Sequence, residues 1–111
     1  MSEHKRIAQA GETPWTEVAP GSRRRVLLST PELMQVEFGF DAGAVGALHS
    51  HPHVQASYVA EGRFEVTIDG HTDTVGPGGS FIVPSGLVHC VRALEAGRLI
   101  DSFTPRRDDF L

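Results

Sequence analysis

At 111 residues, with 40% of them hydrophobic and a formal net charge of -4, the chain has the size and balance of one globular domain with a single core. Nucleic-acid binding is not expected, because the basic run at residues 23–25 is short; we interpret it as a solvated strand end rather than a phosphate-binding patch. No segment has the character of a signal peptide or the length of a membrane span, so we expect no membrane partner and a cytoplasmic location.

The chain divides into a polar arm, residues 1–14, and a strand-rich domain, residues 15–111. The arm shows no periodicity, and we expect it to be mobile or to add an edge strand to a neighbouring chain. Turns that contain Gly, Pro, Ser or Thr separate the predicted strands. One strand is expected to carry His49 and His51. The other strands cover residues 25–28, 34–40, 64–68, 71–75, 81–83, 88–94 and 99–104. Between two of them, Asp69-Gly70 is a dipeptide that favours a tight hairpin.

Many short strands separated by such turns predict an all-β fold, either a sandwich or a closed barrel. No window of helical length carries apolar residues at spacings of three and four. The one helix signal lies near the C-terminus, where Thr104 is expected to cap, and Pro105 to begin, a short turn over residues 106–111.

Histidines form a candidate metal site. His49 and His51 are two positions apart, and on an extended strand such side chains point to the same face. His89 follows the Pro84-Ser-Gly86 turn and can approach the same point from another strand. Imidazole suits several transition metals, and a site with three or four protein ligands leaves room for water or substrate. The sequence therefore predicts a small metal-binding β-barrel.

The spacing of these residues resembles the two motifs of the cupin superfamily. Gly43 lies six residues before His49 and Gln55 six after it, while Gly86 lies three before His89. The resemblance implies a single-domain cupin jelly-roll β-barrel that binds one divalent transition metal (Ni, Zn, Fe or Mn). The ligands that it implies are His49, His51, Gln55 and His89.

Two positions depart from the general motifs: Gln55 stands where the first motif has Glu, and Ala93 where the second has Asn. An amide at residue 55 leaves four neutral ligands, so a divalent ion would keep its full charge. That strengthens Lewis-acid chemistry and weakens a redox role.

Three further residues near these motifs are expected to be bystanders. His53 is interpreted as a supporting or solvent-facing residue, and His71, just past a hairpin turn, as exposed. Cys90 is the single cysteine, which excludes an internal disulfide, and it is expected to point away from His89 into packing as an inert thiol.

A second group of candidate residues lies near the C-terminus. Asp101 and Phe103 share one face of a predicted strand, and a turn could fold Arg107 over the barrel mouth. An inward carboxylate is costly unless it is paired or used. The pattern alone leaves two readings open: a sugar-acid site, or a structural Asp with a surface Arg.

The run from His49 to Tyr58, together with the tail from Asp101, is similar to the pectin-degradation (KdgF-type) cupins over about residues 15–111. This resemblance also accounts for Gln55. It implies conversion of 4,5-unsaturated uronates, released from pectin or alginate by lyases, into linear 5-keto-4-deoxyuronate. The implied catalytic residues are Asp101, Phe103 and Arg107, with Phe103 and Tyr58 shaping the sugar slot.

The partner expected from this resemblance is a small-molecule sugar acid. We also expect a homodimer, chiefly from the resemblance to dimeric cupins; in addition, the arm has no core of its own, and small barrels often protect an edge by pairing with a neighbour. Two alternatives use the same barrel: a cupin dioxygenase with iron or copper, and a non-catalytic cupin that senses sugar acids.

Overall fold

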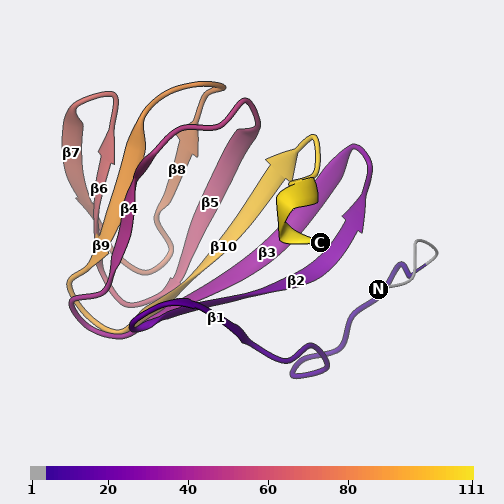
Figure 1. The fold of residues 1–111 in the computed structure, drawn as a ribbon. Coiled ribbons are helices and arrows are strands. Elements are labelled where there is room, and N and C mark those ends of the chain that lie inside the picture. The colour runs from indigo at the N-terminus through magenta and orange to yellow at the C-terminus, as the bar shows by residue number, and fades with distance from the viewer. Residues whose placement is uncertain (1–4) are drawn as a thin grey trace.

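Two antiparallel β-sheets face each other in the computed structural model, which describes residues 5–111 (Figure 1). The larger sheet has six strands, in the order β1 (Thr16–Ala19), β2 (Ser22–Thr30), β3 (Leu33–Phe40), β10 (Gly97–Thr104), β5 (Val54–Glu61) and β8 (Ser80–Val83). The smaller sheet has four, in the order β4 (Val45–His49), β9 (His89–Ala93), β6 (Phe64–Ile68) and β7 (His71–Val75). From β3 to β10 the chain crosses repeatedly between the sheets, as in a jelly roll. The all-β prediction is confirmed.

Turn chemistry sets the hairpins. Asp69 and Gly70 have positive φ values of 49° and 81°, and the hairpin that they close pairs Ile68 with His71, as predicted. The β2–β3 turn differs from the prediction. β2 continues through Ser29 and Thr30, so the turn consists of the next two residues, and β2 is longer than residues 25–28.

The core lies between the sheets and has two parts. One cluster of buried side chains draws on both sheets and consists of Phe40, Val59, Phe64, Val66, Ala93 and Leu99. The other, of Met34, Val36 and Phe103, belongs to the larger sheet and borders the histidines. Burial of each large apolar side chain stabilises the fold by roughly 1.5–3 kcal/mol, so these clusters hold the two sheets together around the site.

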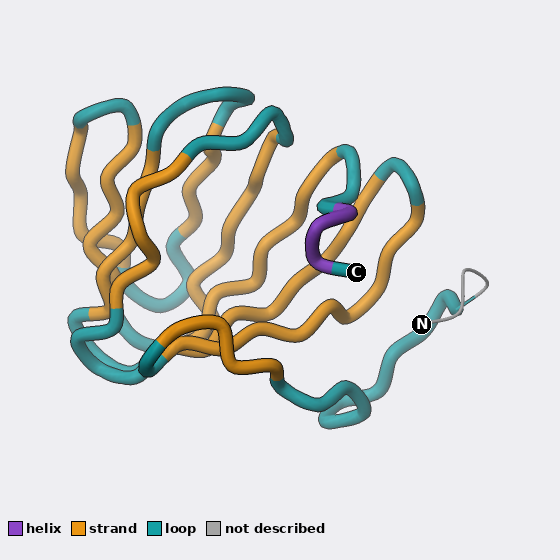
Figure 2. The backbone as a smooth tube through the Cα atoms, viewed as in Figure 1, coloured by secondary structure: helices purple, strands orange, loops and turns teal. Residues whose placement is uncertain are grey.

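The C-terminal segment folds back over the inner face of the larger sheet (Figures 1 and 2). It ends in a single 3-10 turn, η1 (Asp108–Phe110), and the Phe110 ring packs edge-on against Phe38 and Phe103 at 6.1 and 5.8 Å. The predicted cap is wrong: the turn starts after Arg107, not at Thr104, and no side chain caps it. Within residues 5–111 no helix is long and apolar enough to cross a membrane.

The arm lies along the outer face of β2. Residues 5–15 contain no strand or helix, and the first four residues of the predicted arm lie outside the described part. The carbonyl of Thr13 accepts a hydrogen bond from Arg25 at 3.2 Å, and the Trp15 ring lies 3.9 Å from the Arg25 guanidinium carbon. These contacts fasten the arm to the sheet through Arg25.

Beneath the arm, Glu37 is buried between two arginines. Arg25 donates to one of its carboxylate oxygens at 2.7 Å and Arg98 donates to the other. Burial, which would raise the pKa of Glu37, is outweighed by the hydrogen bonds from Arg98 and Arg25, so this pKa lies below its usual value. Glu37 therefore joins β2, β3 and β10 as a carboxylate.

Candidate metal centre and active site

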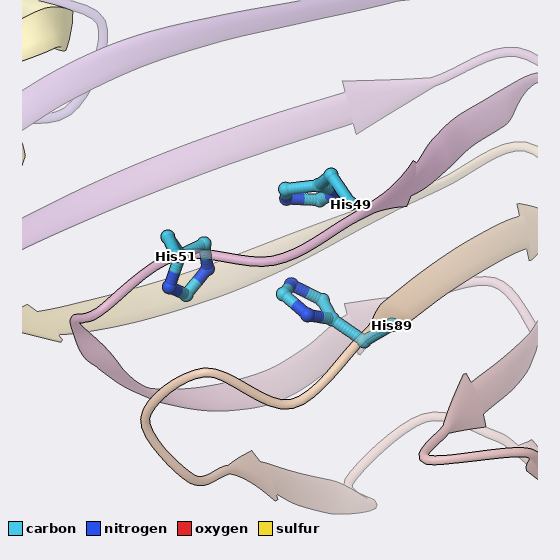
Figure 3. A group of neighbouring side chains, drawn as sticks. All are labelled: His49, His51 and His89. Carbon is cyan, nitrogen blue, oxygen red and sulfur yellow. The ribbon is translucent and has the colours of Figure 1, made fainter.

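Three histidines from different segments point toward one another (Figure 3). Their candidate ligand nitrogens all lie within 4.8 Å of one another. His49 ends β4 and His89 begins β9, and the two are paired across these strands. The prediction that His51 shares a strand with His49 is wrong: His51 lies in the loop that leads to β5. The loop nevertheless returns its ring to the others, at 4.8 Å from His89.

Backbone carbonyls orient all three rings. Nδ1 of His49 lies 2.7 Å from the Ala47 oxygen, Nδ1 of His51 lies 3.0 Å from the His53 oxygen, and Nδ1 of His89 lies 3.0 Å from the Leu87 oxygen. A carbonyl can only accept, so each Nδ1 carries the hydrogen and each Nε2 keeps its lone pair. This is the arrangement in which a histidine binds a metal through Nε2.

The donor set fits a divalent transition metal. Nε2 of His89 is buried and has no hydrogen-bond partner in the described chain. Nε2 of His51 faces Oε1 of Gln55 at 3.0 Å, which places two lone pairs against each other unless a cation lies beside them or His51 is protonated. Burial lowers the pKa of both His51 and His89 and so disfavours protonation. A bound cation would satisfy these atoms.

Gln55 links the histidines to a buried acid. It lies on β5 and is 6% exposed, and its Oε1 faces His51 while its Nε2 faces Ser57 and Asp101. Nε2 donates to Oγ of Ser57 at 3.0 Å and to Oδ2 of Asp101 at 3.3 Å. Gln55 is therefore placed to serve as the fourth predicted ligand while holding Asp101.

Asp101 is an inward-facing carboxyl in the middle of β10. It is 4% exposed, and Oδ1 has no hydrogen-bond partner within residues 5–111. Burial raises the pKa of Asp101 to about 7, against the opposing effects of the Ser57 hydroxyl and the Arg107 charge. A buried, incompletely paired acid of this kind in a cavity is a candidate for proton transfer.

The other two predicted catalytic residues lie beside it. Phe103, 2% exposed, packs its ring 5.7 Å from His51. The Arg107 guanidinium carbon lies 5.2 Å from the Phe103 ring and 4.3 Å from the Phe110 ring. Asp101, Phe103 and Arg107 line a cavity of about 460 Å³ together with His49, Gln55 and His89. The structure thus joins the metal-site residues and the C-terminal residues in one site.

Some sequence predictions about neighbouring residues are wrong. Tyr58 does not shape this cavity: it alternates with inward Ser57 and Val59 and is 49% exposed on the outer face of β5. Cys90 borders the cavity and is half-buried rather than fully buried, while its place on β9 between the inward residues His89 and Val91 agrees with a side chain that points away from His89. His71 is exposed, as predicted.

His53 acts on the site through its backbone. Its carbonyl fixes the ring of His51, and its own ring lies 5.6 Å from that ring. This position agrees with the supporting role expected for His53.

Arg24 and Phe110 also line the cavity, and sequence analysis missed both. Alternation along the strand could have indicated Arg24, because consecutive side chains point to opposite faces and Arg24 must therefore face away from Arg23 and Arg25. All three arginines are half-buried, so the basic run is not a solvated strand end. Phe110 gave no comparable signal, because its position depends on the fold of the C-terminal turn.

Known proteins resemble the chain over most of its length. A family model for the cupin domain matches residues 36–103. The pectin degradation protein KdgF of Dickeya dadantii (strain 3937) is 41% identical over 102 residues, covering 90% of this chain and 93% of that protein. The solved structure of KdgF from Halomonas sp. has a TM-score of 0.93 and 41% identity, covering 96% of this chain and 99% of the other. An RmlC-like cupin from Shewanella frigidimarina NCIMB 400 has a TM-score of 0.93 and 40% identity, covering 99% and 97%.

Proposed function

The chain belongs to the cupin family, and we propose that within this family it is an enzyme of pectin or alginate breakdown that opens 4,5-unsaturated uronates to linear 5-keto-4-deoxyuronate. Similarity to KdgF across nearly the whole chain supports the link to pectin degradation. The observation that carries the proposal is the placement of Asp101, buried and incompletely paired, in the same cavity as the histidines and Arg107.

We assign one divalent transition metal to Nε2 of His49, His51 and His89 and to Oε1 of Gln55. Nickel, zinc, iron and manganese all accept such ligands. When bound, the ion supplies Lewis-acid charge that polarises the substrate oxygens. The protein contributes rings held by backbone carbonyls and a buried amide, so the site is formed before the substrate arrives.

Asp101 is assigned the proton transfer. The substrate is an enol ether conjugated to a carboxylate, and ring opening needs a proton on C4 and water on C5. Asp101 delivers the proton to C4, and the water that adds at C5 returns a proton to the carboxylate. The resulting hemiketal then opens: the bond from C5 to the ring oxygen breaks, C5 becomes a ketone, and the hydroxyl proton moves to the ring oxygen. The hydrogen bond from Gln55 to Oδ2 leaves Oδ1 available for this step.

Arg107 and Phe103 are assigned to binding. A guanidinium at the cavity wall suits the substrate carboxylate, and Phe103 gives the sugar ring an apolar wall beside His51. When Arg107 holds the carboxylate, C4 of the substrate has a fixed position relative to Asp101. Proton transfer then takes place within one oriented complex and does not depend on a random encounter.

The test is turnover of lyase-digested pectin and alginate by metal-loaded protein, followed as loss of the conjugated alkene absorbance. Spontaneous opening is subtracted with a buffer control. We expect opening well above that control for at least one of the two substrates. Binding of unsaturated uronate without faster opening would instead identify the sugar-acid sensor, and oxygen consumption with an aromatic or acid substrate would identify the dioxygenase.

We also propose that the protein is a homodimer. The strands β1 and β8 lie at the edges of the larger sheet, and β4 and β7 at those of the smaller. Unpaired edges favour association unless they are covered. Tyr58 and Ile82, 49% and 60% exposed on neighbouring strands β5 and β8, add an apolar surface for a second copy.

A further inference from the structure

Arg24 presents a cation to the cavity from β2 in the larger sheet, whereas His49 and His89 reach it from the smaller sheet. Alternation along β2 directs Arg23 and Arg25 outward, where Arg23 pairs with Asp41 at 3.2 Å and Arg25 pairs with Glu37 at 2.7 Å. Arg24 lies between them and lines the cavity instead. The three adjacent arginines therefore serve two different faces of one sheet.

Unlike its neighbours, the guanidinium of Arg24 forms no ion pair or hydrogen bond with any residue from 5 to 111, although the charge of Asp109 acts on it from a distance. Its carbon lies 3.9 Å from the centre of the Phe110 ring, a cation–π contact that fixes its position without using its hydrogen-bond donors. A guanidinium offers five donors, and a half-buried one with none of them used by protein is placed to receive an anion.

Arg107, by contrast, already has a carboxylate partner. Its Nε and Nη2 donate to the two oxygens of Asp109 at 3.0 and 2.9 Å, which occupies one edge of the planar fork. The Phe110 ring contacts the guanidinium groups of Arg107 and Arg24, with centroid distances of 4.3 and 3.9 Å. The two cations are thus held beside one aromatic ring, and Arg24 is the one with its donors free.

We propose that Arg24 is a carboxylate-binding residue of this site and acts with Arg107 to select substrates that carry a carboxylate. This inference rests on the proposed function for the identity of the acid, an unsaturated uronate. Two guanidiniums facing one cavity favour an anionic sugar over a neutral one of the same shape, because a neutral sugar leaves the donors of Arg24 without an anionic partner. Arg24 would act on substrate binding rather than on proton transfer.

A purely structural role would use Arg24 to pack against Phe110 and hold the C-terminal turn. Two variants separate the roles. Arg24→Met keeps a long side chain against the ring but removes the charge, whereas Arg24→Lys keeps the charge. Arg23→Met is the matched control, because Arg23 is the adjacent residue on the outer face.

The experiment compares the metal-loaded wild type and the three variants on unsaturated uronate and on its methyl ester. For Arg24→Met we expect kcat/KM on the acid to fall about ten- to a hundred-fold, mainly through KM, with little change on the ester. Arg24→Lys should retain part of the preference for the acid, and Arg23→Met all of it. Equal acid preference in wild type and Arg24→Met would overturn the proposal, as would equal losses on acid and ester.

A binding measurement keeps this test separate from the proposed reaction. Galacturonate and galactose, which have no alkene to react, are titrated into wild type and Arg24→Met at equal metal loading and followed by NMR. If wild type opens no uronate but prefers galacturonate, and Arg24→Met loses that preference, the reaction is wrong and Arg24 still binds carboxylates. If both proteins bind the two sugars equally, the assignment of Arg24 is wrong, whatever the reaction.

Discussion

Nε2 of Gln55 donates to Oδ2 of Asp101 at 3.3 Å while Oε1 of the same amide faces Nε2 of His51 at 3.0 Å. A single side chain therefore spans the distance between the histidine cluster and the buried acid. A glutamate at this position could accept but not donate, and it would put a second carboxylate beside Asp101. The amide thus suits a site that needs both a cation and a carboxyl free to exchange a proton.

The first prediction concerns metal content. We expect about one divalent ion per chain in the purified protein, and its loss in the double variant His49→Ala/His89→Ala, because that variant removes two of the three converging nitrogens. Elemental analysis after exhaustive dialysis measures it. His71→Ala, which removes an exposed histidine of β7, is the control and should keep the metal. Equal metal content in the double variant and the wild type would refute the assigned site.

The second prediction concerns Asp101. Asp101→Asn keeps the shape and can still accept from Gln55, but it cannot transfer a proton. Turnover of unsaturated uronate should fall about 10²- to 10⁴-fold while metal content is unchanged. Alkene absorbance and elemental analysis on the same preparation give both values. Wild-type turnover in Asp101→Asn would remove Asp101 from the mechanism, and loss of metal would show that its role is structural.

The third prediction concerns Glu37 and the pH dependence of stability. Glu37→Gln leaves Arg25 and Arg98 without their shared carboxylate, so the free energy of unfolding at pH 7 should fall by about 1–3 kcal/mol. The pKa of Glu37 is lower in the folded state, so its contribution is complete above the unfolded-state pKa and is lost as pH falls through the folded-state pKa. The difference between variant and wild type should therefore shrink in acid.

Urea denaturation at pH 7 and at stepwise lower pH measures this difference. Glu61→Gln is the control, because Glu61 also pairs with Arg98 but its side chain is 62% exposed. It should change stability by no more than about 0.5 kcal/mol. A difference for Glu37→Gln that stays constant with pH would contradict the ion-pair explanation.

The fourth prediction is the homodimer. Sedimentation equilibrium at micromolar concentration should give twice the chain mass of 12.0 kDa. The double variant Tyr58→Lys/Ile82→Lys places charges on the exposed apolar surface and should shift the protein toward monomer without unfolding it. A wild type that sediments as a monomer would rule out the dimer, while a dimer unaffected by the two lysines would place the interface elsewhere.

Local sequence chemistry determined the all-β class, the Asp69-Gly70 hairpin and the alternation that turns Asp101 and Phe103 inward. These features depend on neighbouring residues: a period of two along a strand and turn positions that accept positive φ. The histidine spacing likewise indicated a metal site, because the chain between His49 and His51 is too short to separate them widely.

The tertiary structure decided what depends on contacts between distant segments. The return of the C-terminal turn places Phe110 against Phe38 and Phe103 and beside Arg24, far away in the sequence. The same fold pairs Arg107 with Asp109 and leaves the donors of Arg24 free. Turn residues near the C-terminus specify only that the chain can bend, whereas packing of the Phe110 ring against Phe38 and Phe103 determines the position of the C-terminal turn. Which arginine faces the cavity unpaired is therefore a property of the packed barrel rather than of the sequence pattern.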